Sequence, residues 1–121
     1  MAKILLIEDD AFLNKLYIDI LTSIGHQPTS VMDGNSAFQQ IILGGWDLIL
    51  LDMILPNMNA IEILNKIKIE NPDKLKQKFL VLTNLDQDPL LEKVTEFGIK
   101  YFNKGKLNPD QLTNIINDQL K

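Results

Sequence analysis

The chain has 121 residues and a formal net charge of −4, with 45% hydrophobic and 23% charged residues, a balance typical of one globular domain. It has no cysteine, which excludes disulfides, thiolate metal sites and cysteine nucleophiles. Its acidic charge argues against direct nucleic-acid binding, and no apolar run reaches the roughly 18 residues of a membrane span. The start Met-Ala-Lys does not resemble a signal peptide, so we expect a cytoplasmic protein without membrane contact.

The first predicted elements are a strand and a helix. Residues 3–7 form a short apolar strand that ends in three acids. The N-cap Asp10 begins the helix and Gly25 ends it in the left-handed conformation. His26, the only histidine, is expected to be a solvated loop side chain after that turn. The inward face of the helix is predicted at Leu13, Leu16, Ile20 and Ile24.

A second strand and a second helix follow. Residues 28–31 form a weaker strand, which Pro28 places near a sheet edge because proline cannot donate to a central ladder. Asp33-Gly34 turns the chain into a helix that Gly44-Gly45 closes. Residues 48–51 are then a strand without polar alternation, which is typical of a parallel strand covered on both faces.

The rest of the chain repeats this alternation. We predict a helix from Ala60 that Asn71-Pro72 stops, a strand at 79–82, a helix at 89–97, a strand at 99–102 and a final helix at 109–120. Strand and helix thus alternate five times with short connections. The pattern predicts an α/β fold of the (βα)5 type, with one doubly wound five-stranded parallel sheet between two helical layers.

Chemically useful side chains stand at the carboxyl ends of four of these strands. They are Glu8 and Asp9, Asp52, Thr83, and Lys104. Each alone has an ordinary structural explanation as a helix cap, a strand end or a solvated charge. Because the carboxyl ends of parallel strands share one rim, we expect the five side chains to converge where open α/β sheets place their ligands.

That combination allows specific chemistry. Carboxylates with room for water suit Mg²⁺, and an aspartate can attack phosphorus to form an aspartyl phosphate. Phosphoryl transfer then depends on positioning and charge neutralisation, to which Lys104 and the hydroxyl of Thr83 can contribute.

These motifs resemble the receiver domain of bacterial two-component response regulators over essentially the whole chain. They are Ile4-Leu5-Leu6-Ile7-Glu8-Asp9-Asp10, Asp47-Leu48-Ile49-Leu50-Leu51-Asp52 with Leu55-Pro56, Val81-Leu82-Thr83, and Tyr101-Phe102-Asn103-Lys104. The resemblance, which is to chemotaxis-type receivers among others, implies a flavodoxin-like sheet with strand order 2-1-3-4-5. It also implies one receiver domain over residues 1–121, with no output domain present.

By the same resemblance, Asp52 is the phosphoacceptor and Mg²⁺ is the cofactor. Asp9 would bind the metal directly, Glu8 through water, and Ile54 through its backbone carbonyl. Asp10 is assigned to helix capping instead.

The resemblance further implies that Thr83 and Tyr101 form a switch pair and that Lys104 contacts the phosphoryl group. The family is not enzymatic in the usual sense: it is a signalling receiver that promotes its own phosphorylation and dephosphorylation. The implied partners are a histidine kinase or histidine phosphotransfer protein, and a downstream protein on the face formed by the helix at 89–97, the strand at 99–102 and the final helix. A monomer or a phosphorylation-dependent dimer is expected, with no direct nucleic-acid contact.

Three positions depart from the common pattern of the family. Asn59-Ala60 stands where Asp-Gly is usual, so the loop after Pro56 is expected to take a different turn. Asn84 stands where a small residue is common, and its longer side chain is expected to narrow access to the phosphoryl group. Gly105 replaces a frequent proline. None of the three removes a reacting group.

Two alternative functions stay open. One is an interaction module that keeps the receiver fold but signals without phosphorylation. The other is a phosphatase with an aspartyl nucleophile, but such enzymes usually carry a second aspartate where this chain has Ile54.

Overall fold

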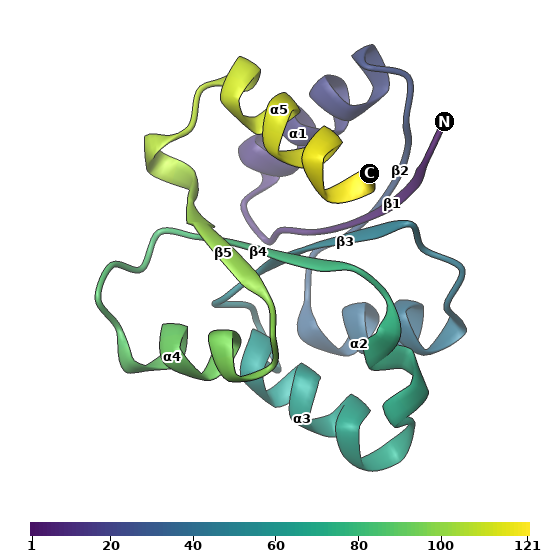
Figure 1. The fold of residues 1–121 in the computed structure, drawn as a ribbon, viewed down its shortest axis with the longest axis vertical. Coiled ribbons are helices and arrows are strands. Elements are labelled where there is room, and N and C mark those ends of the chain that lie inside the picture. The colour runs from purple at the N-terminus through teal and green to yellow at the C-terminus, as the bar shows by residue number, and fades with distance from the viewer.

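In a computed structural model that describes residues 1–121, five parallel strands form one sheet in the order β2-β1-β3-β4-β5, with helices on both faces (Figure 1). The strands are β1 (Lys3–Ile7), β2 (Gln27–Val31), β3 (Leu48–Asp52), β4 (Phe79–Thr83) and β5 (Lys100–Asn103). The helices are α1 (Ala11–Ser23), α2 (Gly34–Leu43), α3 (Ala60–Glu70), α4 (Pro89–Glu96) and α5 (Pro109–Leu120), with 3-10 turns η1 (Pro72–Lys76) and η2 (Lys104–Lys106). The predicted fold class and strand order are confirmed.

The sheet separates two hydrophobic layers. Helices α1 and α5 cover one face, and α2, α3 and α4 cover the other (Figure 1). Strands β3 and β4 are buried along their whole length. This explains their unbroken apolar runs, because side chains on both faces of a central parallel strand meet a helix. None of the helices combines the length and the apolar composition needed to cross a bilayer.

The inward face of α1 agrees only in part with the predicted one, in which Leu13 and Ile20 are half-buried against the core. Leu16 is 36% exposed, and the buried residues of α1 are Asn14, Tyr17 and Leu21. Asn14 and Tyr17 lie on the inward face but are polar, so the pattern of apolar residues did not include them. Asn14 is buried because its side-chain amide donates to the backbone carbonyl of Glu8 at 2.9 Å.

The prediction of a solvated His26 is wrong. Its Nδ1 accepts a hydrogen bond from the backbone N–H of Ala2 at 3.1 Å, and its Nε2 is buried without a partner. The first residues of the chain pair with the turn before β2, since the N–H of Gln27 also donates to the carbonyl of Ala2 at 2.8 Å. This pairing covers the imidazole.

The loop after β3 is held by the first turn of α2. Within this loop, Asn57 has a left-handed backbone conformation, with φ of 71°. Helix α3 then begins at Ala60 with Asn59 as its N-cap in a capping box. The N–H of Gly34 donates to the carbonyl of Pro56 at 2.9 Å. A Cβ on Gly34 would lie 2.2 Å from the backbone oxygen of Met58, so only glycine allows this approach.

We predict that Gly34→Ala destabilises the protein by about 1–3 kcal/mol, because the added methyl overlaps backbone that cannot move aside freely. Urea unfolding measures the change. Asn35→Ala, an exposed substitution one residue further on, is the control and should change the free energy of unfolding by less than about 0.5 kcal/mol. Equal effects of both substitutions would contradict the close packing of Gly34.

Candidate functional site

The carboxyl ends of the strands surround a cleft of about 320 Å³. Strand β1 is followed by Glu8 and Asp9, β3 ends at Asp52, β4 ends at Thr83, and Lys104 follows β5. All five residues line the cleft. The other lining residues are Asp10, Leu13, Ile54, Asn84 and Leu85.

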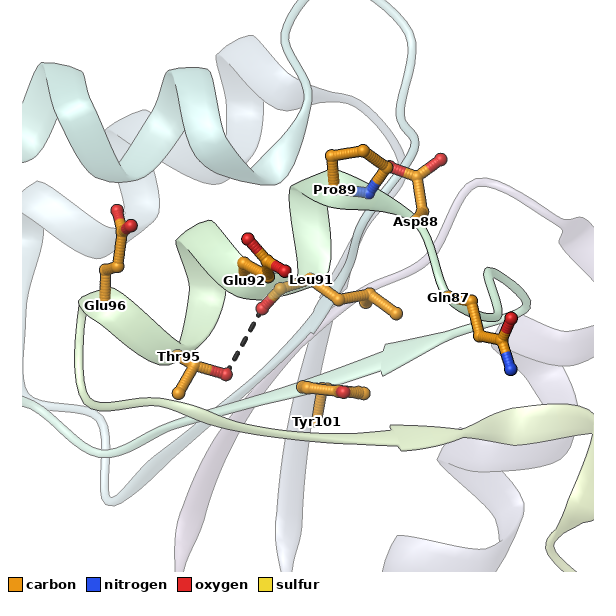
Figure 2. Close-up of a pocket in the computed structure, with 8 residues that line it drawn as sticks. All are labelled: Gln87, Asp88, Pro89, Leu91, Glu92, Thr95, Glu96 and Tyr101. Carbon is orange, nitrogen blue, oxygen red and sulfur yellow. Dashed lines mark hydrogen bonds between the residues drawn. The ribbon is translucent and has the colours of Figure 1, made fainter.

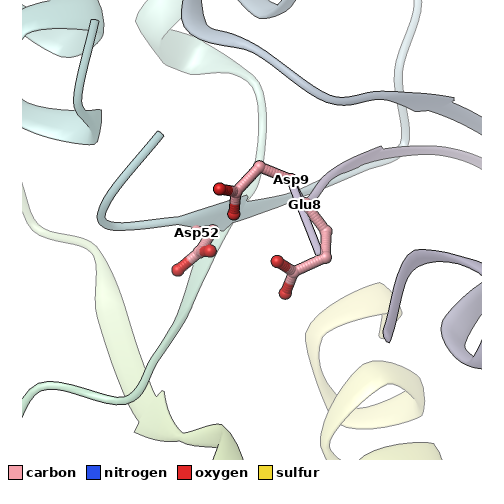
Figure 3. Close-up of side chains that lie close together, drawn as sticks. All are labelled: Glu8, Asp9 and Asp52. Atoms are coloured by element: carbon pink, nitrogen blue, oxygen red, sulfur yellow. The ribbon is translucent and has the colours of Figure 1, made fainter. Parts of the chain in front are cut away.

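Three carboxylates form the acidic part of the cleft (Figure 3). One oxygen each from Glu8, Asp9 and Asp52 lies within 4.8 Å of the others. Glu8 and Asp52 are buried, and Asp9 is exposed. Hard oxygen donors with one side open to water are the donor set that Mg²⁺ prefers, so the residues present fit this ion.

Lys104 joins two of the carboxylates. Its Nζ lies 2.7 Å from Oε1 of Glu8 and 3.1 Å from Oδ2 of Asp52, and its side chain is only 6% exposed. Because all three groups are withdrawn from water, the two contacts are charge-assisted hydrogen bonds with little solvent screening. The sequence showed that Lys104 could reach the cleft, but not that it bridges these two acids.

The crowding of charge shifts two ionisation equilibria. Burial, followed by the charge of Glu8, raises the pKa of Asp52 from the ordinary 3.8 to about 7, although Lys104 opposes the shift. Burial alone would lower the pKa of Lys104. The hydrogen bond to Glu8 and the charges of both carboxylates outweigh that effect, so the pKa of Lys104 is raised.

Glu8 is held by two further hydrogen bonds. Its Oε2 accepts from the backbone N–H of Asp10 at 3.1 Å, while Asn14 binds its backbone carbonyl. Asp10 also caps α1 through the N–H of Leu13, as predicted. Sequence reasoning missed Asn14. The signal that could have found it is its spacing of three and seven residues from the inward-facing Tyr17 and Leu21.

The predicted switch residues lie in two different places. Thr83 is 1% exposed in the cleft, where its Oγ1 accepts from the N–H of Leu85 at 3.0 Å and its hydroxyl proton stays available. Tyr101 does not line the cleft. It is 42% exposed and borders a separate groove between α4 and β5 (Figure 2). Ile54 lines the cleft with a side chain that is half exposed.

The family is decided by comparison with known proteins. A family model described as "Response regulator receiver domain" matches residues 4–117. The chain belongs to this family. It is therefore a receiver domain of two-component response regulators, which are signalling modules.

Individual relatives agree with this assignment. The chain is 26% identical over 110 residues to the Transcriptional regulatory protein CrdR of Helicobacter pylori, covering 91% of this chain and 51% of that protein. It thus spans about half the length of this relative. It is 31% identical over 93 residues to the Response regulator receiver protein CpdR of Brucella abortus, covering 73% of this chain and 77% of that protein.

Solved structures share the fold. The receiver domain of the Pseudomonas aeruginosa sensor histidine kinase PA1611, solved with a magnesium ion coordinated in its active site cleft, superposes with a TM-score of 0.85. The two chains are 23% identical, and the match covers 98% of this chain and 97% of that one. Receiver domains bind Mg²⁺ at an acidic site, and Glu8, Asp9 and Asp52 form an acidic cluster in this receiver.

We predict that Asp52→Asn stabilises the receiver by an amount that depends on pH. Because the pKa of Asp52 is raised in the folded state, folding holds its proton, and ionisation destabilises the fold as pH rises from 3.8 to about 7. The variant should therefore match the parent near pH 4 and exceed it by about 1–3 kcal/mol above pH 7. Once the negative charge of Asp52 is removed, the positive charge of Lys104 is balanced by that of Glu8 alone.

Urea unfolding in metal-free buffer across this pH range measures the difference. Asp19→Asn, which removes an exposed carboxylate from α1, is the control for the loss of one negative charge. If the unfolding free energies of both variants changed with pH in the same way relative to the parent, the burial of Asp52 would not be the cause.

Proposed function

We propose that this receiver is the phosphoacceptor of a two-component phosphorelay. Asp52 receives a phosphoryl group, in a Mg²⁺-dependent reaction, from the phosphohistidine of a histidine kinase or a histidine phosphotransfer protein. The observation that carries the proposal is the contact of Asp52 with Lys104 at 3.1 Å in a cleft shared with Thr83, Glu8 and Asp9. No single structural role explains all five side chains at one rim.

The transfer needs the ionised form of Asp52. A carboxylate oxygen attacks phosphorus, an O–P bond forms, the donor P–N bond breaks, and its electron pair returns to the imidazole nitrogen of the donor. With a pKa raised to about 7, part of the Asp52 population is protonated near neutrality and cannot attack. A divalent cation beside the carboxylates would favour the ionised form.

The acidic residues would hold that cation. We assign the carboxylates of Asp9 and Asp52 and the backbone carbonyl of Ile54 as direct ligands, with Glu8 binding through water. When bound, Mg²⁺ supplies positive charge that offsets the carboxylates and the phosphoryl oxygens. The magnesium-containing structure of the PA1611 receiver supports this assignment by analogy.

Two side chains would position the phosphoryl group. The ammonium of Lys104 already lies within hydrogen-bond distance of the attacking carboxylate, so an oxygen of the new phosphoryl group falls within its reach. The hydroxyl of Thr83 can donate to another oxygen, since its own oxygen accepts from Leu85 and its proton is not committed.

Phosphorylation would then change the surface formed by α4 and β5. Drawing Thr83 toward the phosphoryl group pulls it from the N–H of Leu85 and opens space behind it. Tyr101, now exposed beside α4, would turn into that space (Figure 2). The face formed by α4, β5 and α5 is thereby repacked for a downstream protein.

Acetyl phosphate with Mg²⁺ tests the phosphoacceptor directly. Intact-mass measurement should show one phosphoryl group on the parent and none on Asp52→Asn, because the substitution removes the proposed attacking carboxylate. Chelation of the metal should abolish labelling. Asp19→Asn, on the exposed side of α1, should be labelled like the parent. Labelling of Asp52→Asn at the parental level would refute the assignment.

We further predict that Lys104→Ala lowers the rate of phosphoryl uptake roughly 100-fold, since it removes a buried donor aimed at the developing charge. The matched control is Lys106→Ala. That lysine is exposed and only 4.0 Å from the exposed Asp86, so its removal should leave the rate unchanged. Time courses of labelling measure both variants. Similar rates for the two would remove Lys104 from the mechanism.

A receiver that signals without phosphorylation is the alternative outcome of these experiments. It would take up no phosphoryl group from any donor but would still bind its protein partner. No feature of the cleft favours a phosphatase, because Ile54 offers no acid at the position where those enzymes use one.

A further inference from the structure

The turn between β1 and α1 carries two of the three acids of the cleft, Glu8 and Asp9 (Figure 3). The chain holds these two carboxylates in different ways. That of Glu8 accepts hydrogen bonds from Nζ of Lys104 at 2.7 Å and from the backbone N–H of Asp10 at 3.1 Å. That of Asp9 is exposed, and no ion pair within the chain holds it. The position of the Asp9 carboxylate therefore depends on the backbone that carries it.

The backbone on both sides of Asp9 is bound by Asn14 of α1. The side-chain amide of Asn14 donates to the carbonyl of Glu8 at 2.9 Å, and this carbonyl belongs to the peptide that joins Glu8 to Asp9. Because a peptide is planar, a hydrogen bond to its oxygen also restrains the Cα of Asp9. The backbone N–H of Asn14 donates to the carbonyl of Asp10 at 2.8 Å, which holds the other end of the turn.

The burial of Asn14 is better explained by this turn than by the packing of α1. Asn14 is 6% exposed and lies on the same face of the helix as Tyr17 and Leu21, which belong to an apolar layer. Removing an amide from water is unfavourable, and one hydrogen bond offsets only part of that effect. An apolar side chain at this position would add to the layer without that penalty, but it could not hold the carbonyl of Glu8.

We propose that Asn14 is a positioning residue for the divalent-cation site and acts on Asp9 through the peptide between Glu8 and Asp9. The inference deepens the proposed function and rests on it for one point, that Asp9 is a direct ligand of the cation. A ligand that is already in place loses less conformational freedom when the cation binds, so the affinity is higher. Groups that hold metal ligands from behind typically contribute roughly 10- to 100-fold in affinity.

Titration of the ¹⁵N-labelled receiver with Mg²⁺, in the absence of any phosphodonor, measures this contribution. Asn14→Leu keeps a branched side chain and removes the donor. We expect the Mg²⁺ dissociation constant to rise about tenfold. Asn14→Ala removes the same donor without adding volume beside β1 and should weaken binding by a similar factor. Parental affinity in both variants would overturn the proposal.

Ile116→Val separates the placement of Asp9 from a general loss of stability. Ile116 is fully buried on α5 in the same apolar layer, so the loss of one methylene destabilises the fold without touching the turn. Urea unfolding measures the stability of each variant. Ile116→Val should bind Mg²⁺ like the parent. An equal loss of affinity in this variant would show that Asn14 acts through stability alone and would overturn the proposal.

Phosphoryl uptake from acetyl phosphate gives a second readout. Because Asn14 is assigned to the cation site, Asn14→Leu should take up phosphoryl groups slowly at limiting Mg²⁺ and approach the parental rate at saturating Mg²⁺. Lys104→Ala should stay slow at every Mg²⁺ concentration, because Lys104 is assigned to the phosphoryl group itself. A reduction for Asn14→Leu that saturating Mg²⁺ does not relieve would contradict a role in cation binding.

The side-chain amide of Asn14 is itself a spectroscopic probe. Its two Nδ2 protons should shift as Mg²⁺ is added, with the same dissociation constant as the backbone amide of Asp9. The side-chain amide of Asn117, which is exposed on α5, should not shift and is the control. If the signals of Asn14 did not move at saturating Mg²⁺, its contact with Glu8 would be independent of the cation and the proposal would fail.

These outcomes separate the inference from the proposed function. A tenfold loss of Mg²⁺ affinity in Asn14→Leu, in a receiver that takes up no phosphoryl group from any donor, would preserve the role of Asn14 and refute the phosphoacceptor. Unchanged Mg²⁺ affinity in Asn14→Leu and Asn14→Ala, with Asp52-dependent labelling intact, would refute the role of Asn14 and preserve the phosphoacceptor. A parent that does not bind Mg²⁺ would refute both.

Discussion

Lys104 lies between Glu8 and Asp52, at 2.7 and 3.1 Å, and the rim of the sheet is organised around that ammonium. It joins the segment after β5 to the ends of β1 and β3, which are 96 and 52 residues away in the chain. Without it, the buried carboxylates of Glu8 and Asp52 would repel each other and the neighbouring Asp9 with little screening by water. Even with it, the pKa of Asp52 is raised to about 7. The cleft thus holds more negative charge than its single lysine neutralises. This excess charge favours the binding of a divalent metal, alone or together with a phosphodonor.

Two acidic regions of the molecule differ in how far their carboxylates are buried and paired. In the cleft, buried acids share a buried lysine and are pinned by backbone and amide donors. In the groove beside α4, the exposed acids Glu92 and Glu96 and the ring of Tyr101 lie among the lining residues. The first arrangement suits a small, highly charged group that is transferred.

Most of the fold could be predicted because its signals are local. Unbroken apolar runs indicated β3 and β4, and capping residues such as Asp33 and Asn108 marked helix starts that the structure has at Gly34 and Pro109. The inward face of α1 was predicted only in part because Asn14 and Tyr17 are polar, although tertiary hydrogen bonding and packing bury them. His26 was wrong for a related reason. Its partner, the N–H of Ala2, is remote in sequence and brought near only by the pairing of β1 with β2.

The sequence by itself determined which chemical groups this receiver carries and at which strand ends they stand, because alternation, capping and strand termination are properties of neighbouring residues. It did not determine which of those groups touch. Only the tertiary structure decided that Lys104 pairs with both Glu8 and Asp52, and that Asn14 holds the backbone of Glu8. Hydrogen bonds and charge interactions act over a few ångströms, and whether separate segments come that close depends on how the whole sheet packs.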